Sequence, residues 1–337
     1  MIEKTVISSI LTGIKPSGDL HIGNYVGAIK PMLDLFEKTE RSFLFVANAH
    51  SLNGLPPLGN IKKQTIQQVA SYIALGVDPE KTHIYLQSDI PEVFELNTIL
   101  SAVTPKSWMN KAHAYKDSVS KNIENKKDVD ENVNMGLYTY PILMASDILA
   151  IGASHIPVGE DQIQHIEITR DIADRFNHYV QRDILATPEY ITTENQNTIV
   201  GIDGRKMSKS YNNVIPLMTS IEERTKAVMK ITTDSKGIDD PKDIENSTIF
   251  KILDCFPQSS RHNIEEFKNN FAVGGIGYGQ AKQILADTLN EYFNPAFERY
   301  QKLMQNSDEI ERILADGSTA VRKIAREKLI KIKENIY

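Results

Sequence analysis

The stretch VISSILTGIKPSGDLHIGNYVGAIKPMLDLF, residues 6–36, decides the fold. An apolar, β-rich run over residues 6–11 predicts a strand, and the glycine- and proline-containing residues 13–18 predict the turn that ends it. A helix is expected to begin near Gly23, because apolar residues then recur at close to helical spacing as far as Phe36. A strand, a tight turn and a helix in this order are typical of a parallel sheet.

The same alternation continues through the first two-thirds of the chain. Further strands are predicted at 43–47, 83–86, 156–158 and 198–202, and helices at 61–76, 137–150 and 161–176. This rhythm predicts an α/β fold with a Rossmann-like parallel sheet covered on both faces, which binds ligands at the carboxyl ends of its strands. The polar, lysine-rich segment 106–134 is predicted to be a mobile insertion outside the core.

The composition changes near residue 215, and helical patterns dominate from there. We therefore expect an α/β domain over residues 1–215 and a helical domain over residues 216–337. The apolar stripe through Val321, Ala325 and Leu329 predicts a last helix that packs back on the first domain. Its basic residues fit either a solvated helix face or a nucleic-acid contact.

Composition excludes several classes of protein. Of the 337 residues, 41% are hydrophobic and 24% are charged, which excludes a disordered or fibrous chain. No apolar run reaches the roughly 18–20 residues of a membrane span, and no signal-peptide pattern is present, so we expect a cytoplasmic protein without a membrane partner. The single cysteine, Cys255, cannot form an internal disulfide or a cysteine-rich metal site, and no metal site is predicted. The net charge of −6 argues against non-specific binding to DNA, although a local basic face stays possible.

Two short motifs carry chemistry. In the first, residues 16–24, small residues let the backbone approach a ligand, and the following helix N-terminus favours an anion to which His21 and Asn24 could donate; such a turn can also be purely structural. In the second, residues 204–210, Lys206 and Lys209 lie three residues apart in a flexible loop. Lysine suits a moving polyphosphate because its charge is compact and its stem is flexible.

These motifs carry a family resemblance. Residues 21–24 (HIGN) resemble the HIGH motif of class I aminoacyl-tRNA synthetases, and residues 206–210 match their KMSKS motif letter for letter. Over nearly its whole length the chain resembles the bacterial-type tryptophanyl-tRNA synthetases. The resemblance implies a tryptophan–tRNA ligase that uses ATP and Mg²⁺ to form tryptophanyl-adenylate and then charges tRNA(Trp). It also implies a homodimer, a catalytic domain over residues 1–215 and an anticodon-binding domain over residues 216–337.

The resemblance further implies roles for individual residues. The expected catalytic residues are His21, Asn24, Lys116, Lys206 and Lys209. The expected ATP-binding residues are Lys15, Pro16, Ser17, Gly23, Asn24, Gly159, Glu160, Asp161, Lys206, Met207, Ser208 and Lys209. The expected tryptophan-binding residues are Leu11, Gly13, His50, Tyr140, Met144, Asp147, Ile148 and Gln162.

The choice of amino acid depends on a predicted helix. Tyr140, Met144 and Asp147 are spaced at i, i+4 and i+7, so they share one face. A thioether packs well against a flat ring, and an ionised Asp147 would accept the single N–H of an indole. The tyrosyl relatives typically carry glutamine where this chain has Met144 and serine where it has Glu160.

Three alternatives stay open at this point. A tyrosyl-tRNA synthetase would share the fold, and the carboxylate of Asp147 would also accept a phenol O–H. A nucleotidylyltransferase can share the HIGH-type turn, and a non-catalytic RNA-binding paralogue can share the whole fold. His165 and Arg170 are candidates for either helix scaffold or direct catalysis.

Overall fold

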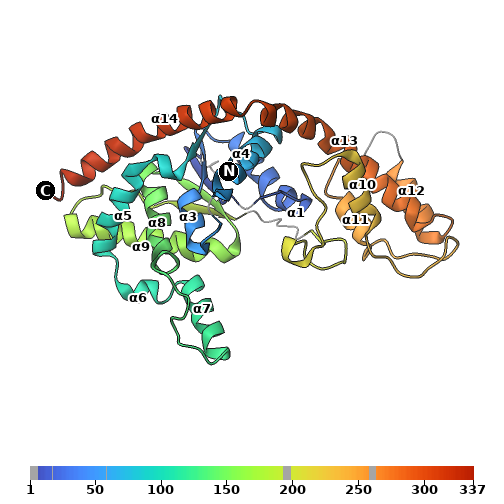
Figure 1. Cartoon of the computed structure of the whole chain (residues 1–337), viewed down its shortest axis with the longest axis horizontal. Helices are drawn as coiled ribbons and strands as arrows, with labels where there is room; N and C mark the ends of the chain where they lie inside the picture. Colours follow the sequence, from blue (N-terminus) through green and yellow to red (C-terminus); the bar gives the residue numbers. More distant parts are fainter. Residues whose placement is uncertain (1–6, 17, 58, 193–198, 258–262) are drawn as a thin grey trace, which may run out of the picture.

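The computed structural model describes residues 7–16, 18–57, 59–192, 199–257 and 263–337. These residues form an arch in which two long helices, α13 (Tyr278–Gln305) and α14 (Ser307–Lys333), bridge a sheet domain and a helical lobe (Figure 1). An arm that contains α6 (Lys106–Met109) and α7 (His113–Glu124) projects from the sheet domain. Among the described residues, no helix combines the length and the apolar character that crossing a membrane requires.

The sheet confirms the predicted α/β fold. In the part of the chain that the structure describes, five parallel strands lie in the order β3-β2-β1-β4-β5. Their bounds are β1 Ile10–Ile14, β2 Ser42–Val46, β3 Thr82–Leu86, β4 His155–Val158 and β5 Glu189–Thr192. Because all strands run the same way, their carboxyl ends meet at one edge, where ligands bind in folds of this kind.

Helices cover both faces of the sheet. The helical elements that precede β4 in the chain are α1 (Ile22–Asn24), the π-helical turn η1 (Tyr25–Ile29), α2 (Lys30–Phe36), α3 (Asn48–Ser51), α4 (Asn60–Ala74), α5 (Pro91–Val103) and α8 (Met135–Ile151). Helices α6 and α7 also precede β4 and lie in the arm. Helix α9 (Ile163–Val180) follows β4, and α10 (Ile221–Met229), α11 (Thr248–Leu253) and α12 (Ile264–Val273) build the lobe with α13. Short 3-10 turns follow α3, β3 and β4: η2 (Leu52–Gly54), η3 (Gln87–Asp89) and η4 (Glu160–Gln162). Another, η5 (Lys209–Tyr211), lies in the KMSKS loop.

Three sequence expectations need correction. The first strand runs from Ile10 to Ile14, whereas the prediction placed it over residues 6–11, of which residue 6 lies outside the described residues. Gly13 belongs to the strand and not to the turn: a Cβ there would lie 2.5 Å from the ring of Phe45, so glycine permits close packing. No strand forms over residues 199–202, where Val200 makes a single bridge to Lys206; residue 198 lies outside the described residues. Segment 106–134, which was predicted to be an insertion outside the core, contains the helices α6 and α7, and its Met109 is buried in the core.

Helix α14 packs directly against the edge strand β3. At Gly317 the two backbones are so close that a Cβ would lie 2.0 Å from the carbonyl oxygen of Ile84. Val321, Ala325 and Leu329 are buried in the same core cluster as α5, α8 and α9. The apolar stripe that the sequence shows on this helix is therefore the face that covers the sheet domain.

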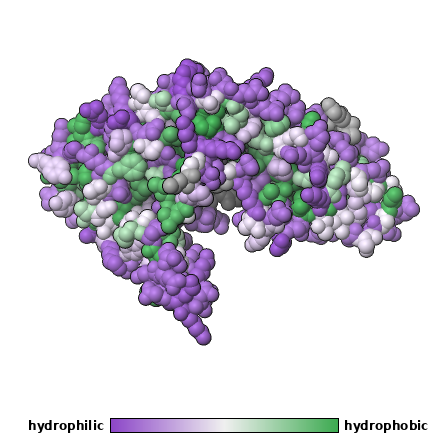
Figure 2. Space-filling view, in the orientation of Figure 1, coloured by the Kyte–Doolittle hydropathy of each residue, from purple (hydrophilic) through white to green (hydrophobic). Residues whose placement is uncertain are grey.

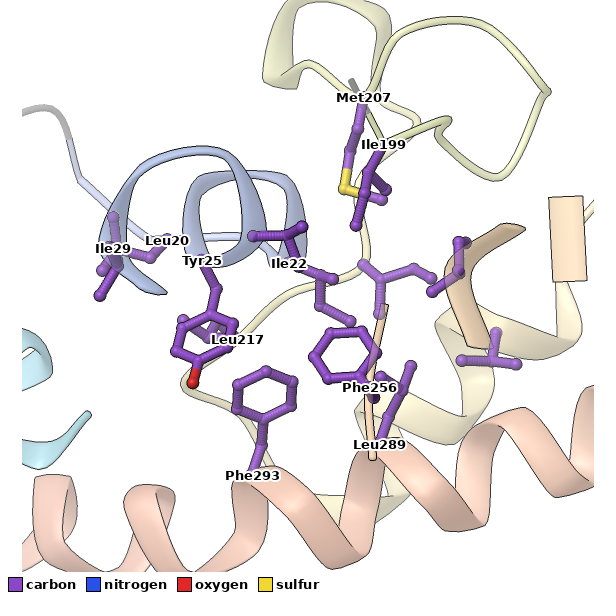
Figure 3. Close-up of a cluster of buried hydrophobic side chains, with 14 of the residues drawn as sticks. Leu20, Ile22, Tyr25, Ile29, Ile199, Met207, Leu217, Phe256, Leu289 and Phe293 are labelled. Atoms are coloured by element: carbon purple, nitrogen blue, oxygen red, sulfur yellow. The ribbon is translucent and has the colours of Figure 1, made fainter. Parts of the chain in front are cut away.

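A second core cluster continues from the sheet into the lobe. Tyr25 of η1 meets Phe293 of α13 edge to face, with ring centroids 5.0 Å apart, and stacks on Phe256 at 6.4 Å (Figure 3). The Tyr25 hydroxyl lies 2.7 Å from that of Tyr292. Met207, from the KMSKS motif, is buried in this same cluster. The helix that follows the HIGH-type turn is thus held between the sheet and the lobe.

Candidate active site

A cavity of about 250 Å³ lies at the carboxyl edge of the sheet, between β1, β2, β4 and α8. This volume is slightly below the roughly 300–1,000 Å³ of drug-sized ligand pockets, so the cavity suits a small ligand such as an amino acid. Its walls include every predicted tryptophan-binding residue: Leu11, Gly13, His50, Tyr140, Met144, Asp147, Ile148 and Gln162. Lys15 and Gly159, which were predicted to bind ATP, also line it.

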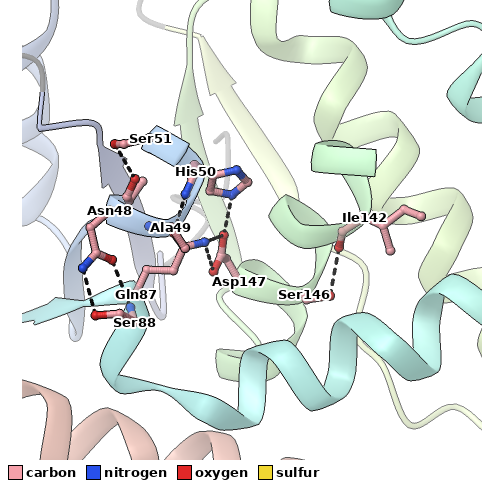
Figure 4. Close-up of polar contacts among 10 residues, drawn as sticks. Asn48, Ala49, His50, Ser51, Gln87, Ser88, Ile142, Ser146 and Asp147 are labelled. Atoms are coloured by element: carbon pink, nitrogen blue, oxygen red, sulfur yellow. Dashed lines mark hydrogen bonds and ion pairs between the residues drawn. The ribbon is translucent and has the colours of Figure 1, made fainter. Parts of the chain in front are cut away.

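Asp147 is the buried carboxylate of this cavity. Its exposed fraction is 2%, and it accepts hydrogen bonds from His50 Nε2 at 3.0 Å and from Gln87 Nε2 at 3.0 and 2.9 Å (Figure 4). Burial raises the pKa of the Asp147 carboxyl, and the hydrogen bonds from His50 and Gln87 oppose that rise. Asp147 is therefore neither a helix cap nor a solvated helix residue.

Tyr140 is held by a histidine on the neighbouring helix. Its hydroxyl lies 2.8 Å from Nε2 of His165, which is buried on α9. Burial, with a contribution from Asp117, raises the pKa of Tyr140 to about 12. Burial is also the main reason that the pKa of His165 is lowered to about 4. Both groups are therefore neutral at physiological pH, and His165 orients Tyr140 from behind the cavity wall.

The HIGH-type turn lies between β1 and α1. Asn24 Oδ1 accepts from the backbone N–H of His21 at 3.0 Å, which caps the start of the helix. Burial, followed by the field of Lys209, lowers the pKa of His21 to about 4, so its imidazole is neutral at pH 7. Gly23 is closely packed, because a Cβ there would lie 3.0 Å from His21 Nδ1 and 3.4 Å from Met207 Cβ.

Backbone hydrogen bonds join the residues that follow the KMSKS loop to the HIGH-type turn. Ile22 donates to the carbonyl of Ile215 at 3.0 Å, and Leu217 donates to the carbonyl of Leu20 at 2.9 Å. A Cβ on Gly18, whose φ is +82°, would lie 3.9 Å from Nζ of Lys209. The two motifs are thus neighbours in space.

Asn213 organises the KMSKS loop from inside. Its Oδ1 accepts from the backbone N–H of Ser208 at 2.8 Å, and its Nδ2 donates to the carbonyl of Lys206 at 3.0 Å and to Asp203 at 2.7 Å. The hydrogen bond from Asn213, with those from Arg205, lowers the pKa of Asp203 to about 2. This arrangement fixes the backbone on which the loop presents its lysines.

The remaining predicted ATP residues are less closely gathered. Pro16 is buried after β1, whereas Ser17 lies outside the described residues. Glu160 and Asp161 are exposed in η4 directly after β4, and Asp161 accepts from Gln162 Nε2 at 3.0 Å. Lys116 is exposed on α7 in the arm, and the structure does not place it on the cavity wall.

Two residues of the site were not predicted from the sequence. Gln87 directly follows β3, so its place at the carboxyl edge of a parallel sheet was a signal that could have identified it. Asn213 lies three residues beyond the KMSKS motif, and nothing in the local sequence pattern distinguishes it from Asn212.

Comparison with known proteins places this geometry in a family. The model for "tRNA synthetases class I (W and Y)" matches residues 4–294, and the chain belongs to this family. The relatives it is similar to are tryptophan–tRNA ligases: that of Campylobacter jejuni is 43% identical over 97% of this chain and 99% of its own length. That of Neisseria meningitidis is 44% identical, with 97% of each chain covered.

A solved structure agrees with these matches. The tryptophanyl-tRNA synthetase of Campylobacter jejuni, complexed with ADP and tryptophan, has a TM-score of 0.88 to this chain at 43% identity, and the match covers 97% of this chain and 99% of that one. The family resemblance predicted from the HIGH-type and KMSKS motifs is therefore confirmed.

Proposed function

We propose that this protein is a tryptophan–tRNA ligase, which activates L-tryptophan with ATP and transfers it to the 3′ end of tRNA(Trp). The observation that carries the proposal is the buried carboxylate of Asp147 in an apolar cavity whose wall includes Met144. The match to tryptophan–tRNA ligases over nearly the whole chain supports the same choice.

Selection of the amino acid follows from the chemistry of the cavity. The indole N–H donates to Asp147, and the ring packs against the thioether of Met144. Phenylalanine lacks that donor and would leave the buried carboxylate without a partner on the cavity side, which is a large penalty. Tyr140 and Gln162, which line the cavity, bind the α-ammonium group, and Lys15, which also lines it, binds the carboxylate.

Activation needs positioning more than proton transfer. The tryptophan carboxylate is already ionised at neutral pH, so it attacks the α-phosphate of ATP without a general base, and pyrophosphate leaves. The neutral imidazole of His21 and the carboxamide of Asn24 donate to phosphate oxygens. Lys206 and Lys209, with Lys116 from the arm, stabilise the charge that grows there. Gly23, Pro16, Ser17, Gly159, Glu160, Asp161, Met207 and Ser208 shape the surrounding nucleotide site.

Mg²⁺ enters this reaction with the nucleotide. Within the described ranges, no group of three His, Cys, Asp or Glu side chains could hold a metal ion. A cation that retains water and binds through substrate phosphates, as Mg²⁺ does with ATP, needs no protein cage.

In the second step of the proposed reaction, tryptophan is transferred from the adenylate to tRNA(Trp). The 3′-terminal ribose hydroxyl of tRNA(Trp) attacks the adenylate carbonyl, and AMP leaves. We assign anticodon binding to the helical region 216–337 and expect a homodimer in the cytoplasm. The arm is hydrophilic, and the face shown in Figure 2 is hollowed between the arm and the lobe.

Aminoacylation tests the proposal directly. Purified protein is incubated with ATP, Mg²⁺, radiolabelled tryptophan or radiolabelled tyrosine, and transcripts of tRNA(Trp) or tRNA(Tyr). We expect acid-precipitable tryptophan on tRNA(Trp) alone, with a rate that falls as salt is raised because phosphate contacts are screened. Charging of tRNA(Tyr) with tyrosine, or no charging of either transcript, would overturn the proposal.

A further inference from the structure

Gln87 is a buried side chain that the proposed chemistry does not use. It directly follows β3, its exposed fraction is 1%, and its amide joins three separate elements of the sheet domain. Burial of an uncharged amide at the ligand-binding edge of a parallel sheet is costly unless every polar atom has a partner. Here the partners lie on α3 and α8, which both contribute to the cavity wall.

The hydrogen bonds of Gln87 fix the orientation of its amide. Oε1 accepts from the backbone N–H groups of Ala49 and His50, both at 3.2 Å. Nε2 must therefore face Asp147, where it lies 3.0 Å from Oδ1 and 2.9 Å from Oδ2 (Figure 4). Flipping the amide would set a carbonyl oxygen against a carboxylate and an NH₂ group against two N–H donors.

We propose that Gln87 is a positioning residue that fixes Asp147 as an acceptor for the indole N–H and so contributes to the selection of tryptophan. This inference rests on the function proposed above. Gln87 acts on both oxygens of the carboxylate, whereas His50 acts on Oδ2 alone. Gln87 therefore sets the rotation of the carboxylate plane and leaves the remaining acceptor directions to the cavity.

The physical need for such a residue comes from burial. A carboxylate that is removed from water tends to take up a proton, and a protonated Asp147 would present a donor to a ligand that itself donates. The hydrogen bonds from Gln87 and His50 oppose this tendency and favour the charged form of Asp147. Losing Gln87 would therefore weaken the binding of tryptophan more than that of ATP, which the cavity at Asp147 does not contact in the proposed function.

Several titratable groups face this pair and have to be considered in a pH experiment. His50 bonds to Asp147 from α3, and burial, with a contribution from Asp147, raises the pKa of Tyr85 of β3. Tyr140 of α8 lines the same cavity, and His165 of α9 bonds to its hydroxyl from behind the wall. Because these groups are present in the wild type and in every variant, the wild-type pH profile separates their titration from that of an introduced group.

Two substitutions test the proposal. Gln87→Met keeps the length of the side chain and removes its donors and acceptor. Gln87→Glu keeps the acceptor for Ala49 and His50, and when protonated its O–H donates to Asp147 as the amide does. When it is ionised, two carboxylates face each other. Gln68→Met is the matched control, because Gln68 is also buried but lies on α4 and does not line the cavity.

The readout is tryptophan-dependent ATP–pyrophosphate exchange, with KM for tryptophan and for ATP measured from pH 6 to pH 9. For Gln87→Met we expect a roughly ten- to hundredfold higher KM for tryptophan at every pH, as for loss of a hydrogen bond to a charged group. The KM for ATP stays within about twofold. For Gln87→Glu we expect a near-wild-type KM for tryptophan at low pH, which rises about tenfold per pH unit once the introduced group ionises.

The possible failures are distinguishable. If the wild type exchanges with tryptophan but Gln87→Met leaves its KM unchanged, the inference about Gln87 is overturned and the proposed function stands. An equal rise in the KM of Gln87→Glu at all pH values would show a merely structural role and would also overturn the inference. If the wild type shows no tryptophan-dependent exchange, both the proposed function and this inference are overturned.

Discussion

Replacement of Asp147 by asparagine removes one charge from the cavity without changing the shape of the side chain. The carboxylate accepts from Gln87 at both oxygens and from His50 at Oδ2, so an amide nitrogen at either position would face a donor. The variant therefore loses part of this network as well as the charged acceptor that we assign to the indole N–H.

The size of the effect follows from these contacts. A hydrogen bond to a charged group contributes about 1.5–3 kcal/mol, and about 1.4 kcal/mol corresponds to a factor of ten in affinity. We expect the KM for tryptophan to rise roughly 10- to 150-fold in ATP–pyrophosphate exchange, with the KM for ATP within about twofold. Isothermal titration with tryptophan alone should give a matching loss of affinity.

Ser146→Ala is the matched control for Asp147→Asn. Ser146 is the preceding residue on α8 and is fully buried, but its hydroxyl donates within the helix to the carbonyl of Ile142 at 2.8 Å (Figure 4). This control should leave both KM values unchanged. An unchanged KM for tryptophan in Asp147→Asn, in a variant whose circular dichroism matches the wild type, would refute the role given to Asp147.

Three further predictions follow from other parts of the molecule. Lys209→Ala should slow adenylate formation in single-turnover experiments by roughly 10²–10³-fold with the affinity for tryptophan nearly intact, and an equal loss of that affinity would contradict its phosphate role. The pKa of His165 is lowered from 6.5 to about 4, so below pH 6.5 the unfolded chain binds a proton that the native state does not. The stability of the native state therefore falls between pH 6.5 and pH 4. Over this range the melting temperature of His165→Gln should fall less than that of the wild type. Gly317→Ala should lower the free energy of unfolding in urea by roughly 1–3 kcal/mol, because its Cβ would collide with the backbone of Ile84. The control Gly279→Ala, with no atom within 4 Å of the new Cβ, should not be destabilised.

The fold could be predicted largely from the sequence because each element has a local pattern. Alternating apolar runs predicted β2, β3 and β4 close to their observed bounds and β1 with shifted bounds, whereas β5 was not predicted. The apolar stripe of α14 marks the face that packs on the sheet domain. The errors arose where tertiary contacts override local composition. Gly13 looks like a turn residue but lies in β1. Glycine occupies this strand position because the ring of Phe45 leaves no room for a larger side chain.

The candidate site was predictable to the extent that motifs or one helix face carry it. Tyr140, Met144 and Asp147 share α8, so their spacing alone brings them to one wall of the cavity. Gln87 and Asn213 were missed because they act through bonds to residues that no periodic pattern links to them. Gln87 bonds to a carboxylate 60 residues further along the chain, and Asn213 bonds chiefly to backbone groups.

The central claim is that this protein activates tryptophan, and ATP–pyrophosphate exchange measured in parallel with tryptophan, tyrosine and phenylalanine, with and without Mg²⁺, tests it most directly. The account predicts Mg²⁺-dependent exchange with tryptophan and none above background with the other two amino acids. Exchange driven by tyrosine, or by none of the three, would contradict it.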